Sequence, residues 1–313
     1  MTTACPRKWC HAPEVPCLDG YVELAQCPAW PRGDADQVPA QDGHVLPWSG
    51  LAMGHVDLEA VAAASRTRLV AIIGLPKAGK TTALAAWFVL LRRGRHPAGN
   101  SFAGSYSMMG WNSVSRHFDW PPEGHRGFPP HTTSASRTPA LLHLALSNGE
   151  GNIRDVLFTD VPGEWFREWS YDPKSSPGSC WIADEADVFV LMSDADALAG
   201  KDRGKARSEY TNLANRVASV ADDRPVIPVR TKADIAVPDG IDDALARVDE
   251  RLFGQTAIPM SVLDTDGQAP LLESIEKIIA TALAPITIPR GKDENLPRDL
   301  MLGFRAPSTL VGR

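Results

Sequence analysis

The chain has 313 residues, a length that favours one α/β domain with appendages over two full domains. Its net charge of −6 argues against broad electrostatic binding to nucleic acid or to an anionic membrane. The longest apolar stretch, residues 83–91, is too short to span a bilayer, and the N-terminus lacks the apolar core of a signal peptide. We therefore expect a cytoplasmic protein with no membrane span and no nucleic-acid partner.

Residues 1–50 are rich in Pro, Gly, Asp and Cys with little periodicity, which predicts an irregular segment. Four of the five cysteines lie within its first 27 residues: Cys5, Cys10, Cys17 and Cys27. Their spacing contains no Cys-x-x-Cys pair, so they do not form a standard zinc ribbon. Two interpretations stay open. Either a structural Zn²⁺ bound by the four thiols, or by three of them and His11, orders the segment, or the thiols are free.

Apolar runs separated by helical patterns predict a three-layer α/β/α domain with a mostly parallel sheet over residues 51–286. The expected strands are 68–73, 140–147, 153–160, 186–193, 224–231 and 256–262. The Asn148-Gly149 turn predicts that the second and third of these pair as a hairpin, which adds one antiparallel edge. The expected helices are 56–64, 79–93, 208–221, 242–253 and 269–283. An insertion near 96–137 should hold a further strand and helix, and 287–313 reads as a polar tail.

The segment GLPKAGKTT, residues 74–82, has the G-x-x-x-x-G-K-[ST] spacing of a phosphate-binding loop between an expected strand and an expected helix. Glycines let consecutive backbone N–H groups face the phosphates, and the helix N-terminus adds its dipole. Lys80 would contact the outer phosphates, and Thr81 would bind Mg²⁺ through its hydroxyl. The alternative is a glycine-rich turn that binds nothing. The expected nucleotide contacts are Gly74, Lys77, Ala78, Gly79, Lys80, Thr81 and Thr82.

Asp160 ends the expected strand 153–160, and Gly163 follows it in the pattern D-x-x-G. We expect Asp160 to hold Mg²⁺ through water and the Gly163 amide to contact the γ-phosphate. A plain strand-ending turn is the alternative.

The tetrad Thr231-Lys232-Ala233-Asp234 follows another expected strand and has the pattern [NT]-K-x-D. Guanine presents two neighbouring donors, N1–H and the exocyclic amine, which the Asp234 carboxylate can accept. Adenine presents an acceptor at this edge, so Asp234 would reject it. Lys232 would lay its aliphatic stem over the ring, and Ser261 lies in a loop that would contact the guanine oxygen.

These four segments, in this order, resemble the Ras-like GTPases of the TRAFAC class over residues 66–285. The stretches FAGSYSMMGWNSVSRH, RTPALLHLALS and TDVPGEWFREW further resemble the bacterial double-GTPase and related TRAFAC-clade domains. The resemblance implies a Ras-like P-loop fold, GTP or GDP with Mg²⁺ as ligands, and a switch that hydrolyses GTP. It also implies protein partners at the switch loops and a bacterial multi-component system, some of which are linked to conflict with phage.

The interval from Lys80 to Asp160 is long for a Ras-like domain, so several residues compete for the role of the switch threonine that contacts Mg²⁺. We assign it to Thr138, just before the hairpin, with Thr132 and Thr133 as alternatives. The neighbouring Arg137 is either an arginine supplied to the site in cis or a solvated loop residue.

Glu164 stands where Ras-like enzymes often carry a water-orienting Gln. A carboxylate can orient water but repels the γ-phosphate, so we expect slow hydrolysis that a partner or a dimer contact completes. The catalytic set is thus Lys80, Gly163, Glu164 and Thr138.

The switch loop at 163–169 contains three large aromatic residues, which either form a partner interface or are buried: Trp165, Phe166 and Trp169. Two rival functions remain, a P-loop ATPase or kinase, and a scaffold whose bound nucleotide is not hydrolysed.

Overall fold

The computed structural model describes residues 67–119, 140–263 and 269–284, together with a few isolated positions between Glu23 and Val61. The chain divides into two compact units, Met1–Leu46 and Pro47–Arg313, and the sheet lies in the second. Within these described ranges, no helix combines the length and apolar character needed to cross a bilayer. The domain boundaries expected from the sequence stay a prediction.

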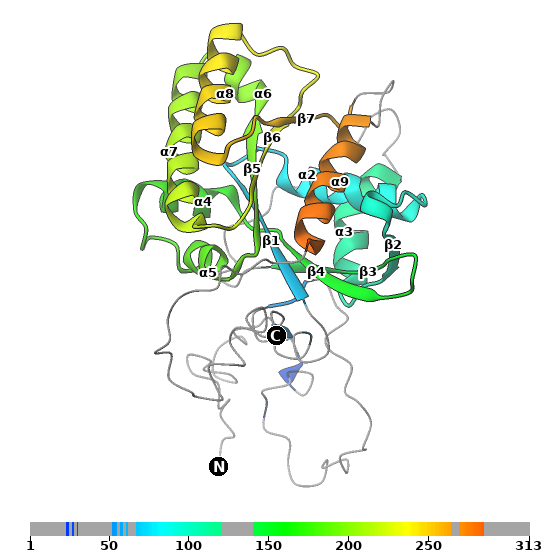
Figure 1. The fold of residues 1–313 in the computed structure, drawn as a ribbon. Helices are drawn as coiled ribbons and strands as arrows, with labels where there is room; N and C mark the ends of the chain where they lie inside the picture. The colour runs from blue at the N-terminus through cyan, green and yellow to red at the C-terminus, as the bar shows by residue number, and fades with distance from the viewer. Residues whose placement is uncertain are drawn as a thin grey trace, which may run out of the picture. The chain divides into compact units, whose positions relative to one another are not determined.

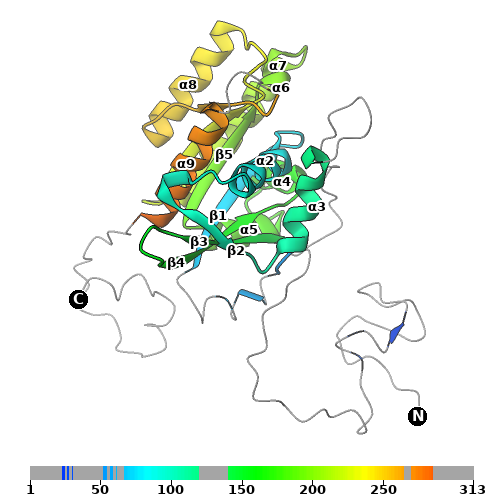
Figure 2. The ribbon, with the colours of Figure 1, turned by 90° about the vertical axis from the view of Figure 1, so that its right-hand side faces the viewer.

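A seven-stranded sheet has the order β2-β3-β4-β1-β5-β6-β7. Its strands are β1 (Thr67–Gly74), β2 (Ser101–Gly104), β3 (Leu141–Ser147), β4 (Ile153–Thr159), β5 (Val188–Asp194), β6 (Val226–Thr231) and β7 (Ile258–Met260). β1 pairs in parallel with β4 and β5, whereas β3 is antiparallel to both β4 and β2. The expected hairpin is therefore confirmed, and β2 lies outside it as the edge strand (Figure 2).

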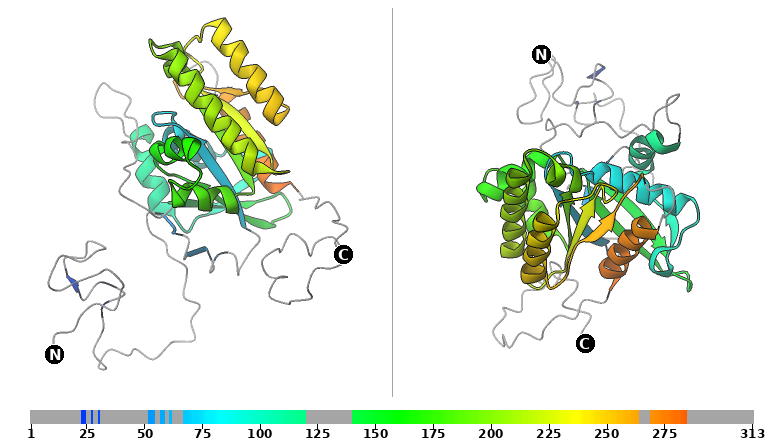
Figure 3. Two further views of the ribbon diagram at one scale, coloured as in Figure 1. Left: turned by 90° about the vertical axis from the view of Figure 1, so that its left-hand side faces the viewer. Right: turned by 90° about the horizontal axis from the view of Figure 1, so that it is seen from above.

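Helices cover both faces of this sheet, as the sequence predicts (Figures 1 and 3). On one face lie α2 (Lys80–Arg92), the short η4 (Pro97–Gly99), α3 (Met108–Asp119) and α9 (Ala269–Leu283). On the other face lie α4 (Gly163–Tyr171), α5 (Pro177–Glu185), α6 (Ala195–Ala199), α7 (Arg203–Ala221) and α8 (Asp239–Phe253). The result is the α/β/α arrangement in which loops at the carboxyl ends of parallel strands carry the site.

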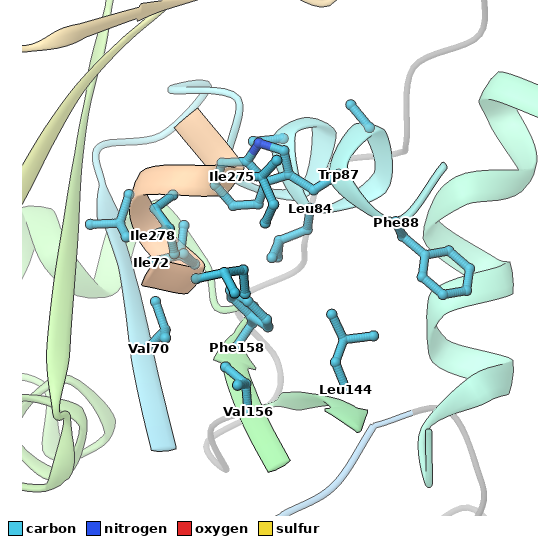
Figure 4. Close-up of a cluster of buried hydrophobic side chains, with 14 of the residues drawn as sticks. Val70, Ile72, Leu84, Trp87, Phe88, Leu144, Val156, Phe158, Ile275 and Ile278 are labelled. Carbon is cyan, nitrogen blue, oxygen red and sulfur yellow. The ribbon is translucent and has the colours of Figure 1, made fainter. Parts of the chain in front are cut away.

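The apolar run 83–91 forms the inner part of α2 and is buried along its whole length. A helix that is apolar all round must be covered on every side, and α2 meets this condition between the sheet, α3 and α9. Figure 4 shows Trp87 and Leu84 above Phe158 of β4, with Phe88 directed toward α3. Phe88 stacks on Trp111 of α3 with ring centroids 5.0 Å apart. Burial of this helix fixes the phosphate-binding loop at its N-terminus.

His143 in β3 attaches the β2–α3 insertion to the sheet. Its backbone N–H donates to Ser107 Oγ at 2.7 Å, and its carbonyl accepts from Trp111 Nε1 at 2.7 Å. The ring Nδ1 accepts from the Tyr106 N–H at 3.0 Å, so Nε2 carries the proton and donates to Asp155 Oδ1 at 2.8 Å. β2 pairs only with Ala145–Ser147, so the Ser107 and Trp111 side chains bond the backbone of His143 where a neighbouring strand would otherwise do so.

Helix α4 occupies a segment where the sequence analysis expects a loop. Trp165, Phe166 and Trp169 follow the i, i+1, i+4 spacing of one helix face, and all three are buried among residues of β1, α5 and α7. A Cβ atom placed on Gly178 of α5 would lie 2.2 Å from the Trp165 ring, so only glycine fits there. Of the two interpretations of these aromatic residues, burial is confirmed.

A buried carboxylate joins α7 to α8. Tyr210 Oη donates to Asp249 Oδ1 at 2.7 Å, and Asp249 is fully buried. Its Oδ2 makes no hydrogen bond within the described part of the chain. Burial raises the pKa of Asp249 to about 6, and Asp242 adds to the rise, against the hydrogen bond from Tyr210 and the charge of Arg230.

We predict that Asp249→Asn raises the free energy of unfolding at pH 8 by about 1–3 kcal/mol. Because the pKa of this carboxyl is raised in the folded state, its protonated form stabilises the fold, fully below about pH 4, and the contribution is lost as the pH rises through about 6. Asparagine keeps an acceptor for Tyr210 without the charge. Urea denaturation should therefore show a gain that shrinks toward about pH 4.5. Asp243→Asn, exposed on the same helix, is the control, and an equal effect of both variants would contradict the prediction.

Candidate functional site

The phosphate-binding loop lies between the end of β1 and the start of α2. Gly79 precedes the helix with φ 77°, and Lys77 has φ 67°, so both have left-handed backbone conformations. The Ala78 N–H closes the turn by donating to the Leu75 carbonyl at 3.1 Å. A non-glycine residue with positive φ carries backbone strain, and strain of this kind is typical of functional loops.

Lys80 and Thr81 begin α2 and face the ends of neighbouring strands. Lys80 is buried, and its Nζ donates to the carbonyls of Gly74 at 3.0 Å and Leu75 at 3.3 Å. Thr81 Oγ1 donates to Asp160 Oδ1 at 2.7 Å. The structure thus brings together two of the three side chains that the sequence assigns to Mg²⁺, Thr81 and Asp160.

The electrostatics of this group depend on burial. Burial lowers the pKa of Lys80 to about 8, an effect that the charges of Asp160 and Glu164 partly offset. Burial also raises the pKa of Asp160, opposed by the hydrogen bond from Thr81 and by the charge of Lys80. Neither Lys80 nor Asp160 has enough opposite charge nearby to offset its burial. An anionic ligand would supply that charge for Lys80, and a cation bound with it would do so for Asp160.

Gly163 begins α4 and packs directly on the phosphate-binding loop. A Cβ atom at this position would lie 2.3 Å from Pro76 N and 2.5 Å from the Leu75 carbonyl carbon. These are backbone atoms, so a side chain at position 163 would have to displace the loop or the helix. Glu164, next in the chain, is half-buried and close enough to Lys80 to influence its pKa. The D-x-x-G segment and the loop therefore form one packed unit.

The segment 231–234 lies at the end of β6, beside the phosphate-binding loop. Thr231 Oγ1 donates to the Ser193 carbonyl at 3.0 Å. Ser261 Oγ donates to Asp234 Oδ1 at 2.5 Å and accepts from the Leu263 N–H at 3.1 Å. Ser261, which the sequence assigns to the same base site, thus holds the Asp234 carboxylate directly.

One cavity of about 570 Å³ extends from the phosphate-binding loop to the segment 231–234. Its size is that of an ordinary small-molecule site. Residues from the phosphate-binding loop, the D-x-x-G segment, the segment 231–234 and the loop after β7 line it: Lys77, Ala78, Gly79, Lys80, Thr81, Thr82, Ala83, Val161, Gly163, Asp196, Thr231, Lys232, Asp234, Ile235, Met260, Val262 and Leu263. The cavity thus connects a cationic, N–H-rich end to an end that carries a carboxylate.

Some assigned residues lie outside the described part of the chain, namely Thr132, Thr133, Arg137, Thr138, Cys5, Cys10 and Cys17. Cys27 is described and is buried, with its thiol reduced. Among the described residues, no three His, Cys, Asp or Glu side chains gather as a metal site. Zinc binding and the choice of switch threonine therefore stay predictions.

Sequence reasoning missed two residues beside Lys232. Asp194 Oδ2 accepts from Lys232 Nζ at 2.8 Å, and Asp196 Oδ2 lies 3.6 Å from the same ammonium. The one available signal was the position of Asp194 at the end of a predicted strand, where functional side chains of parallel sheets gather.

The family model Double-GTPase 2 matches residues 68–283, from β1 to the end of α9. Among solved structures, the signal recognition particle receptor SRβ-GTP/SRX complex from Chaetomium thermophilum matches at 19% identity and a TM-score of 0.37, over 68% of this chain and 99% of that chain. Era in complex with MgGDPNP and a segment of 16S ribosomal RNA matches at 19% identity and a TM-score of 0.37, over 78% of this chain and 66% of that chain. A search of curated proteins found no match.

We predict that Gly163→Ala lowers the free energy of unfolding by about 1–3 kcal/mol, because its Cβ would overlap backbone atoms of the phosphate-binding loop. Gly204→Ala is a matched control in the first turn of α7, where a Cβ meets no atom within 4 Å. That control should be neutral or stabilising by up to about 1 kcal/mol. Urea denaturation followed by tryptophan fluorescence compares the two, and an equal effect would refute the packing argument.

Proposed function

Because the chain belongs to the Double-GTPase 2 family, we propose that it is a molecular switch that binds GTP and GDP with Mg²⁺ and hydrolyses GTP slowly. The observation that carries the proposal is the single cavity lined by both Lys80 and Asp234. A phosphate-binding loop alone fits many nucleotides, whereas a carboxylate at the base end fits guanine.

At the phosphate end, the backbone N–H groups of the loop and the Lys80 ammonium would bind the β- and γ-phosphates. Thr81 and Asp160 would hold Mg²⁺, which neutralises phosphate charge when bound. The fit rests on their 2.7 Å contact and on the raised pKa of Asp160, a half-buried carboxyl that accepts from the Thr81 hydroxyl. Oxygen donors of this kind suit a hard divalent cation. Thr138 completes the metal site in this proposal.

At the base end, Asp234 would accept the guanine N1–H and exocyclic amine. Ser261 fixes one oxygen of this carboxylate, and the other makes no hydrogen bond within the described ranges. The stem of Lys232 would lie against one face of the base. Adenine would place an acceptor against Asp234, so ATP should bind weakly. This contrast separates the proposal from a P-loop ATPase or kinase.

Slow hydrolysis follows from Glu164. The residue lies beside Lys80, so its carboxylate can orient a water but adds negative charge near the γ-phosphate. We propose that a partner protein or a second copy completes the catalytic site. Because Trp165, Phe166 and Trp169 are buried, a partner would contact the exposed side of α4, which includes Arg167 and Tyr171. On the motif resemblance alone, we extend this proposal to a cytoplasmic role in a bacterial multi-component system. Some systems of this kind are linked to conflict.

We predict that the wild type binds GTP at least about tenfold more tightly than ATP, and that Asp234→Asn shifts the preference toward XTP. The amide offers a donor where xanthine presents an acceptor. Titration with GTP, ATP and XTP measures the change, with Asp239→Asn, exposed in the first turn of α8, as the control. Unchanged affinity for all three nucleotides in Asp234→Asn would refute the guanine assignment.

The same titrations can follow turnover. A slow switch without its partner should release phosphate on the order of 10⁻³ per second or below. Rapid turnover by a purified monomer would contradict the proposed need for a partner, and complete absence of turnover would favour the scaffold alternative.

We predict that GDP binding takes up about half a proton at pH 8, because the pKa of Lys80 is about 8 before binding and the phosphates hold the ammonium charged. Affinity should therefore fall as the pH rises above 8. Calorimetric titration in two buffers of different ionisation enthalpy measures the uptake. Lys80→Arg is the matched variant, since its guanidinium stays charged and the uptake should vanish. Wild-type enthalpies that do not depend on the buffer would refute the assignment.

A further inference from the structure

The corner between β5 and α6, residues Ser193–Asp196, contacts the segment 231–234 at two points. The Ser193 carbonyl accepts from Thr231 Oγ1, and Asp194 Oδ2 accepts from Lys232 Nζ at 2.8 Å. Asp194 is also the N-cap residue of α6, because its Oδ1 accepts from the Asp196 N–H at 3.0 Å. One carboxylate thus links the start of a helix to the ammonium of the lysine assigned to the base site.

Lys232 depends on this contact for its geometry. Its backbone has φ 55°, a conformation that a lysine rarely adopts, and its four-carbon stem carries much rotamer freedom. Asp194 holds the far end of that stem, and its side chain is only 11% exposed. Burial strengthens such a charge-assisted contact, whereas the more distant Asp196, 66% exposed, contributes less. The stem is therefore fixed at both ends along the wall of the 570 Å³ cavity.

We propose that Asp194 is a positioning residue for nucleobase binding, which acts by holding Lys232 against the base. The inference rests on the proposed guanine-nucleotide site and adds a residue that the motifs do not include. Pairing with Asp194 also keeps the Lys232 ammonium away from Asp234, two residues further along the chain. The Asp234 carboxylate then stays available to the two guanine donors.

If Asp194 only capped α6, a variant that keeps the cap would bind GDP as the wild type does. Asp194→Ser keeps an oxygen that can cap α6 but is too short to reach Lys232. If Asp194 acts through Lys232, this variant should bind GDP about tenfold more weakly, the scale of a lost charge-assisted hydrogen bond. Lys232→Ala should weaken binding at least as much. The double variant should bind no more weakly than Lys232→Ala, because the interaction is already absent.

Pyrophosphate separates positioning of the base from general damage to the site. It occupies only the phosphate-binding loop, so its affinity, measured by competition with fluorescent GDP, should be unchanged in Asp194→Ser and Lys232→Ala. Asp187→Asn is the matched control, since Asp187 lies directly before β5, pairs with Arg68 at 3.0 Å and accepts from the Leu69 N–H of β1. Its GDP affinity should equal that of the wild type.

Additive losses in the double variant, or an equal loss of pyrophosphate binding, would overturn the inference alone. A wild type that fails to bind GDP would overturn the proposed function and this inference with it. Asp194→Asn covers the case in which Asp194→Ser does not fold, because asparagine retains both the cap and a neutral acceptor. Its GDP affinity should lie between those of wild type and Lys232→Ala, and wild-type affinity would overturn the inference.

Discussion

β1 pairs in parallel with β4 on one side and with β5 on the other, so the carboxyl ends of three strands meet at one edge of the sheet. Gly74, Asp160 and Asp194 lie at or directly after these ends and thus share one neighbourhood. The contact between Thr81 and Asp160 depends on this register, because the two residues follow β1 and β4 in the chain. β6 and β7 extend it and bring Asp234 and Ser261 within hydrogen-bond distance. The covering helices hold the edge in place, because α2 is buried along its length.

Charge at this edge is balanced only in part. Lys80 is buried and Asp160 is half-buried, and desolvation shifts the pKa of each in the direction that favours its neutral form. A polyphosphate with a cation would reverse both shifts, so ligand binding and stability are linked. Lys232 differs, since Asp194 already compensates its ammonium. The charge of Lys80 is thus left for a ligand to offset, whereas that of Lys232 is already offset within the protein.

Sequence reasoning singled out the loop 74–82, Asp160 and the segment 231–234 as candidates because each belongs to a short motif beside a strongly apolar strand. The hairpin and α9 follow equally from local turn and periodicity signals. Helix α4 was missed, because its aromatic residues suit an exposed switch loop as well as a buried helix face. The Asp194–Lys232 pair spans 38 residues and exists only because β5 and β6 are neighbours. The role of His143 likewise depends on where β2 ends.

The Trp165 ring packed over Gly178 has a consequence for recognition. It holds α4 as a formed helix against α5 and the sheet, so the exposed side of α4 presents a preset shape. A protein that binds there would not have to order a flexible loop and would avoid that loss of conformational entropy. Binding there would then depend on the position of a formed helix, rather than on folding and unfolding of a segment.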